Sequence, residues 1–133
     1  MKYLKTTLVL FIVTFVFAIV NVKAQVIGIV GITIPSFKGT YMSSQRDKSY
    51  DNLQYIKKAS CRDDFSGDGR VIDARAHGML AGMKDSPWVE AKSNQKVSFG
   101  ANSKTIGLWR LYLQSRKSLP TTATFSGEWT IDS

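Results

Sequence analysis

The sequence has little of several residue types on which catalysis and covalent stabilisation depend. It contains one cysteine, Cys61, one histidine, His77, and two glutamates, Glu90 and Glu128. A single cysteine excludes a disulfide within the chain, although small exported domains often contain several. A single histidine excludes every metal site that needs two histidine ligands, such as that of the His-Glu-x-x-His metalloproteases.

Catalytic motifs are also missing. No serine stands in a Gly-x-Ser-x-Gly sequence, which marks the nucleophile of many hydrolases. A triad of a serine with His77 and Asp73 or Asp85 is formally possible, but a lone histidine on a strand is more often an ordinary surface residue. Nothing in the spacing of Glu90 and Glu128 brings them to the roughly 5–10 Å that a glycosidase pair requires. We therefore predict a protein that is not an enzyme and that has no cofactor; an unrecognised hydrolase site is the alternative.

Cys61 has two interpretations. Cysteine is often a small buried hydrophobic residue. In a secreted chain, a single cysteine can instead form a disulfide with a second copy and produce a dimer.

Residues 1–24 have the layout of a secretory signal peptide. Lys2 and Lys5 precede an apolar run over 7–20, and 22–24 offers small residues before a cut, so the mature chain would begin at Gln25. The apolar run is shorter than the stretch of about 20 residues that a membrane-spanning helix needs. We therefore expect a secreted, extracellular protein; an uncleaved N-terminal anchor is the alternative.

Residues 25–133 are expected to form a single domain that carries an excess of positive charge. Removing 1–24 takes away three lysines and no acid, which lowers the formal net charge from +8 to +5. Outside the cell, this charge attracts anionic partners such as phospholipid headgroups, lipid-linked precursors and wall polymers. A surface that is merely soluble is the alternative, and the compartment argues against nucleic acid.

Alternation of apolar and polar residues predicts an all-β chain. The clearest strands are 122–131, with Gly127 at a bulge or a close approach of another backbone, and 106–114, and we expect these two to pair in an antiparallel manner. Shorter strands are predicted at 70–77, 88–92 and 96–99.

Three other segments are less regular. The run 26–34 is almost continuously apolar, which is typical of a central strand. Residues 50–59 fit a strand better than a helix, and 78–85 fits a loop or one helical turn. Six to eight short strands predict a small antiparallel β-sandwich, with a barrel as the alternative. We expect a core of large aromatic residues, namely Phe99, Phe125, Trp88, Trp109 and Trp129.

An acidic turn follows Cys61. Asp64, Ser66 and Asp68 have the spacing of the first half of a calcium-binding loop, but the position that needs a bidentate carboxylate is Arg75. We therefore favour a turn between two strands, and a cation site completed by a distant loop is the alternative. No metal is predicted.

The candidate binding residues lie near the end of the 106–114 strand. Arg110 and Tyr112 share its polar face, and Arg116 and Lys117 follow in the next connection. Arginine beside tyrosine can hold phosphate through bidentate hydrogen bonds and cation–π contacts. A solvated strand face with ordinary surface cations is the alternative.

Three short aromatic motifs carry a resemblance to known secreted proteins. They are Ser86-Pro87-Trp88-Val89, Leu108-Trp109-Arg110-Leu111-Tyr112-Leu113 and Phe125-Ser126-Gly127-Glu128-Trp129. With these motifs, 85–133 resembles the DUF2712 group of Gram-positive bacteria and, more distantly, the lactococcin 972-type bacteriocins. The resemblance implies a two-sheet sandwich and, at most, attachment to or interference with a bacterial envelope.

Taken together, these observations predict a secreted, non-enzymatic domain that binds an anionic component of a cell envelope, in the manner of a bacteriocin-like antimicrobial. The alternative is an extracellular structural or matrix protein that self-associates through strand edges or through Cys61.

Overall fold

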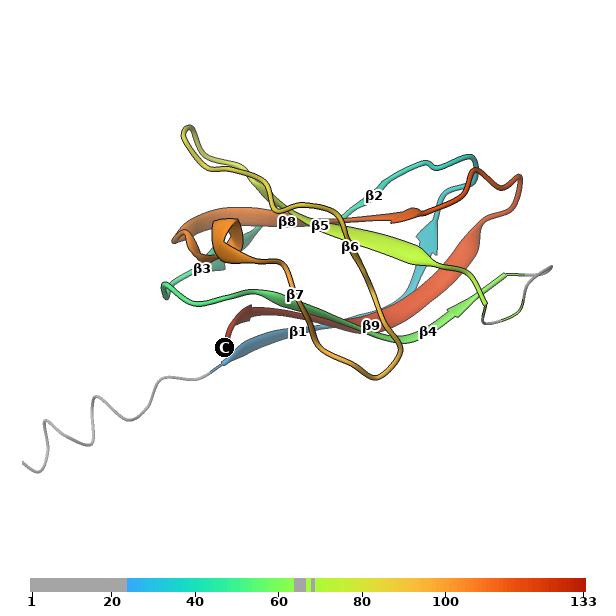
Figure 1. Cartoon of the computed structure of the whole chain (residues 1–133), viewed down its shortest axis with the longest axis horizontal. Helices are drawn as coiled ribbons and strands as arrows, with labels where there is room; N and C mark the ends of the chain where they lie inside the picture. Colours follow the sequence, from blue (N-terminus) through green and yellow to red (C-terminus); the bar gives the residue numbers. More distant parts are fainter. Residues whose placement is uncertain (1–23, 64–66, 68) are drawn as a thin grey trace, which may run out of the picture.

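The computed structural model describes residues 24–63, 67 and 69–133. The expected signal peptide, apart from Ala24, lies outside the described residues, as do Asp64, Ser66 and Asp68 of the acidic turn. The described chain folds into two antiparallel sheets that lie over one another (Figure 1). The prediction of a small β-sandwich is confirmed.

One sheet has four strands and the other has five. The four-stranded sheet has the order β1 (Gln25–Ile34), β9 (Ala123–Asp132), β4 (Tyr55–Arg62) and β7 (Val97–Ser98). The five-stranded sheet has the order β2 (Tyr41–Met42), β8 (Gly107–Ser115), β5 (Ile72–Gly78) and β6 (Val89–Glu90), and β3 (Arg46–Lys48) also pairs with β8. A short 3-10 helix, η1 (Ala101–Lys104), precedes β8.

The core lies between the sheets and is built by strand alternation. The apolar residues of the alternating patterns are buried: Trp109, Leu111 and Leu113 on β8, Ala123, Phe125, Trp129 and Ile131 on β9, and Ile72, Ala74 and Ala76 on β5. Four of the five expected aromatic residues are buried in this core, namely Phe99, Phe125, Trp109 and Trp129. The indole N–H groups of the two tryptophans donate to the Thr105 carbonyl and to Gln54 Oε1, each at 2.9 Å. Both rings therefore enter the core with their polar atoms satisfied.

Two predictions about sheet order are wrong. β8 and β9 do not pair, because they belong to different sheets, where β9 lies between β1 and β4 and β8 lies between β2 and β5. β1 is not central, since its only strand partner in the described chain is β9. The apolar run therefore did not reflect burial on both faces of the strand, because Val26 and Val30 point to solvent, with 48% and 86% of their surface exposed.

Two buried ion pairs join segments at opposite ends of the sandwich. Lys48 of β3 lies 3.2 Å from Asp132 at the end of β9, and both side chains are almost fully buried. Arg70, just before β5, places its Nε 2.7 Å from Asp63, just after β4. Figure 1 shows that β3 and the C-terminus lie at one end of the molecule and the end of β4 at the other. Each pair therefore connects the two sheets at one end.

Candidate functional site

The candidate site is the outer face of the five-stranded sheet, on β5 and β8. Arg75 and His77 alternate with buried alanines on β5, and Arg110 and Tyr112 alternate with buried leucines on β8. In the antiparallel register, Arg75 stands opposite Tyr112 and His77 stands opposite Arg110. These four side chains therefore form a two-by-two cluster, which we call the cation–aromatic face.

An aromatic pair occupies one diagonal of this face. The rings of His77 and Tyr112 are stacked, with centroids 4.7 Å apart and planes inclined by 15°. Nδ1 of His77 lies 2.8 Å from a carboxylate oxygen of Asp85, and the Gly78 N–H donates to the same oxygen at 3.0 Å. Because Asp85 holds His77 and the Tyr112 ring stacks on His77, the aromatic pair is in place before any ligand arrives.

The two arginines occupy the other diagonal. The guanidinium carbon of Arg75 lies 4.8 Å from the ring centroid of Trp88, which is a cation–π distance. Trp88 was expected in the core, but it is only half buried, and it supports Arg75 from outside the sheet. The reason is that Trp88 precedes the two-residue strand β6, where the residue that points inward is Val89, opposite Ala74.

The charges of Arg75 and Arg110 are not neutralised by the described protein. Neither guanidinium forms an ion pair with a carboxylate of the described residues, and the Nε of each is enclosed without a hydrogen-bond acceptor. Enclosed donors without an acceptor are uncommon in native proteins, because leaving one unpaired costs free energy. An anionic ligand would supply acceptors for the remaining guanidinium N–H groups and a countercharge for both arginines.

Arg116 and Lys117, the other two predicted residues, follow β8 in the next connection. Arg116 is already engaged by two acids: it lies 2.7 Å from Asp73 and 3.1 Å from Glu90. The hydrogen bond and charge of Asp73, aided by Glu90, raise the pKa of Arg116 above its ordinary value. Lys117 is exposed. Both residues line a pocket of about 280 Å³, whose other lining residues are Gly69, Arg70, Val71 and Leu119.

The structure therefore places the four predicted residues at two locations. Arg110 and Tyr112 join Arg75 and His77 on the cation–aromatic face, whereas Arg116 and Lys117 border the small pocket. Alternation on β5 indicates that Arg75 and His77 point outward, but no local signal in the sequence shows that β5 lies beside β8.

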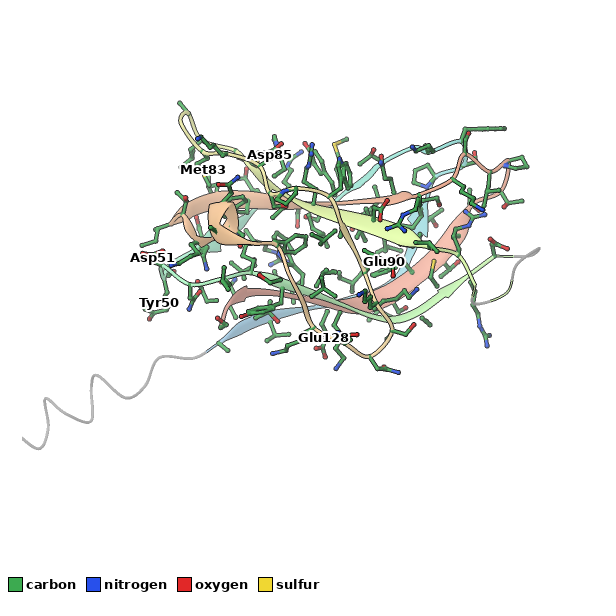
Figure 2. All side chains as sticks on the ribbon, in the orientation of Figure 1. Tyr50, Asp51, Met83, Asp85, Glu90 and Glu128 are labelled. Carbon is green, nitrogen blue, oxygen red and sulfur yellow. The ribbon has the colours of Figure 1, made fainter. Side chains whose placement is uncertain are left out.

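The structure brings together only some of the groups considered for catalysis: His77 lies 2.8 Å from Asp85, whereas the two glutamates are on different sheets. Glu90 is on β6 of the five-stranded sheet and Glu128 is on β9 of the four-stranded sheet (both labelled in Figure 2). Glu128 lies 3.9 Å from Lys57 on its own sheet. Within residues 24–63, 67 and 69–133, no three side chains of the types that bind metals gather into a cluster.

Comparisons with family models, with curated proteins and with solved structures give no match for this chain. In the part of the chain that the structure describes, no helix has the length and apolar character needed to cross a membrane.

Proposed function

We propose that this chain is a secreted, non-enzymatic protein that binds an anionic component of a cell envelope through the cation–aromatic face. The ligand class includes wall polymers, lipid headgroups and lipid-linked precursors. The observation that carries the proposal is that Arg75 and Arg110 lie without acidic partners among the described residues, beside a fixed aromatic pair. The bacteriocin-like activity implied by the resemblance is part of the proposal.

Binding would proceed in two steps. The net positive charge first attracts the anionic surface and raises the rate of encounter. The guanidinium groups of Arg75 and Arg110 then donate hydrogen bonds to phosphate or carboxylate oxygens in bidentate geometry, which gives the contact its specificity. Arg75 and Arg110 stand at diagonal positions of the face, so the face presents two cations to one ligand that carries two anionic groups.

The experiment is co-sedimentation of the purified protein with whole cells and with isolated envelopes over a salt series. Exposed electrostatic contacts weaken strongly as ionic strength rises. We expect the wild type to retain saturable binding at high salt. The double variant Arg75→Glu/Arg110→Glu should lose it, because each glutamate repels the ligand at the site.

A matched control separates the site from bulk charge. Lys92 and Lys96 are exposed residues of the segment that joins β6 to β7, and Lys92→Glu/Lys96→Glu changes the net charge by the same amount. We expect this variant to bind like the wild type at high salt. If both double variants lose binding equally, the specific site is refuted and bulk charge explains the attraction.

A second candidate function, self-association as a structural protein, is favoured by one observation. β1 is a ten-residue edge strand without a charged residue, and Val26 and Val30 are exposed on it. Long, uncharged, apolar edges are the edges that pair with other chains. Cys61 is 1% exposed, so a disulfide through it would require the core to open.

Analytical ultracentrifugation tests this second candidate. An oligomer that forms with or without reductant and disappears in Val26→Lys would support pairing through β1, because an edge lysine opposes it. A wild type that stays monomeric at the highest soluble concentration would exclude it. An oligomer that dissociates only with reductant would instead assign the contact to Cys61.

A further inference from the structure

The connection between β5 and β6 projects beyond the five-stranded sheet (Figure 1). It carries the apolar sequence Met79-Leu80-Ala81-Gly82-Met83, followed by Lys84. Gly82 has a φ of 83°, a conformation that favours glycine, and the Met83 N–H donates to the Leu80 carbonyl at 3.2 Å. The loop is therefore a tight turn that presents Leu80 with 49% of its surface exposed.

A second exposed apolar residue lies beside this turn. Ile106, just before β8, is 57% exposed. The next residue, Gly107, has the side chains of Leu80 and Met83 packed over it, because an added Cβ there would lie 3.3 Å from Leu80 Cδ1 and 3.1 Å from Met83 Sδ. We call Leu80, Ala81 and Ile106, supported from below by Met83, the apolar tip.

Two lysines flank the apolar tip along the chain. Lys84 and Lys104 are exposed. Lys84 is the charged residue of the stretch 78–84, which contains Leu80, and Lys104 is the charged residue of the stretch 103–107, which contains Ile106. Asp85 comes next in the chain, but its carboxylate is turned to His77 and to the Gly78 N–H; Figure 2 shows Met83 and Asp85 together at this loop. A second acid, Asp47 of β3, pairs in the register with Leu108, two residues after Ile106. Asp47 directly follows the basic residue Arg46 in the chain.

Small apolar tips with flanking lysines are suited to the membrane interface. Apolar side chains enter the boundary between headgroups and acyl chains, while lysines reach the anionic headgroups. A specific protein partner would require about 1,000 Å² or more of buried surface, which two half-exposed aliphatic side chains do not supply. The chemistry of the tip therefore favours a bilayer over a protein groove.

We propose that the apolar tip inserts shallowly into an anionic phospholipid bilayer, with Lys84 and Lys104 on the headgroups. This inference rests on the proposed function, because it names the bilayer surface as the anionic partner. The loop projects on the outer side of the five-stranded sheet (Figure 1), the side on which the cation–aromatic face lies. Insertion of the tip would therefore bring Arg75 and Arg110 close to the same layer of phosphates.

The test is co-sedimentation of the purified protein with two kinds of vesicle, phosphatidylcholine alone and phosphatidylcholine mixed with phosphatidylglycerol. We expect binding to the mixed vesicles, and about tenfold or greater weakening in Leu80→Glu/Ile106→Glu, since two aliphatic contacts are lost. Phe37→Glu/Tyr50→Glu is the matched control, because it places two acids at exposed apolar residues outside the apolar tip, the cation–aromatic face and β1. It should bind like the wild type.

A second variant reports insertion directly. Leu80→Trp keeps the tip apolar, and its additional fluorescence should shift to shorter wavelength on the mixed vesicles and be quenched by brominated lipid. Equal weakening of the tip and control variants, or no quenching of the tip tryptophan, would overturn the inference. Wild type that binds isolated wall polymer but no vesicle would overturn this inference alone, whereas absence of binding to every envelope fraction would overturn the proposed function as well.

Discussion

At the scale of the residue, Gly127 is where the fold leaves least room. It lies on β9 between β1 and β4, and a Cβ added there would overlap the backbone carbonyl oxygen of Lys57 and lie 3.1 Å from Phe125 Cε1. The overlapping atom is backbone, so it cannot move aside as a flexible side chain would. The sequence pattern had predicted a bulge or a close approach of another backbone at Gly127, and this is confirmed.

Gly127→Ala should therefore destabilise the protein. We expect a loss of about 1–3 kcal/mol in the free energy of unfolding, the usual cost of an added methyl group in a packed site. Gly28→Ala on β1 is the matched control, because a Cβ at Gly28 meets no atom within 4 Å and the unfolded chain is affected in the same way. Urea unfolding measures the free energy of unfolding of both variants. Equal values would contradict the close approach of the Lys57 carbonyl oxygen to Gly127.

The candidate binding residues show how much of a site single positions reveal in a sequence. Alternation along β8 correctly places Arg110 and Tyr112 on the outward face, since a strand has a period of two. The same alternation does not show that Arg75 and His77 lie beside them, because that contact joins two strands that are far apart along the chain. The aromatic support of Arg75 by Trp88 was missed because aromatic residues are usually assigned to the core.

At the scale of the element, the ion pair between Lys48 and Asp132 connects β3 to the end of β9. Nζ of Lys48 donates to Asn52 Oδ1 at 2.7 Å and to the Ile131 carbonyl, besides contacting Asp132. Asp132 also accepts hydrogen bonds from the backbone N–H groups of Ser49 and Tyr50. The turn after β3 is thereby attached to the opposite sheet.

Lys48→Met should be strongly destabilising, because it leaves the buried carboxylate of Asp132 without its cation. We expect a loss of about 3–5 kcal/mol. The same substitution at Lys57, whose pair with Glu128 is half exposed at 3.9 Å, should cost less than about 1 kcal/mol. Thermal and urea unfolding measure the loss of stability in both variants. Similar losses would show that the Lys48 charge does not stabilise the connection between β3 and the end of β9.

The same pair predicts the pH dependence. Burial lowers the pKa of Lys48 below its ordinary value of 10.5, and Asp132 offsets part of this effect. Between the folded-state pKa and 10.5 the unfolded chain binds more protons, so the contribution of Lys48 to the free energy of unfolding rises with pH. The stability advantage of wild type over Lys48→Met should therefore increase as pH approaches 10.5, and an advantage that shrinks over this range would contradict the direction of the shift.

At the scale of the whole molecule, the β class and the core could be predicted, but the order of the strands could not. Period-two alternation and buried aromatic residues are local signals, and they identified β5, β8 and β9. The pairing of β8 with β9 was wrong because neighbours along the chain were taken as neighbours in a sheet, whereas the intervening connection crosses between the two sheets. β2 and β3 were missed because neither alternates: β2 is two apolar residues in a row, Tyr41 and Met42, and β3 is three charged residues in a row, Arg46–Lys48.

The arrangement of the whole molecule places its two proposed contact regions on one side. The cation–aromatic face lies on the outside of the five-stranded sheet, and the apolar tip projects from the same sheet (Figure 1). The uncharged edge strand β1 belongs to the four-stranded sheet. Envelope binding and self-association would therefore use different surfaces, and each can be altered without the other.

The measurement that tests the central claim most directly is envelope binding at high salt by Arg75→Lys/Arg110→Lys. This variant keeps every positive charge but replaces two bidentate guanidinium groups with point charges. If the cation–aromatic face is the binding site, we expect affinity to fall by about tenfold, equivalent to about 1.4 kcal/mol, while thermal stability stays close to that of the wild type. Unchanged affinity would show that these arginines contribute only charge, and would contradict the proposed site.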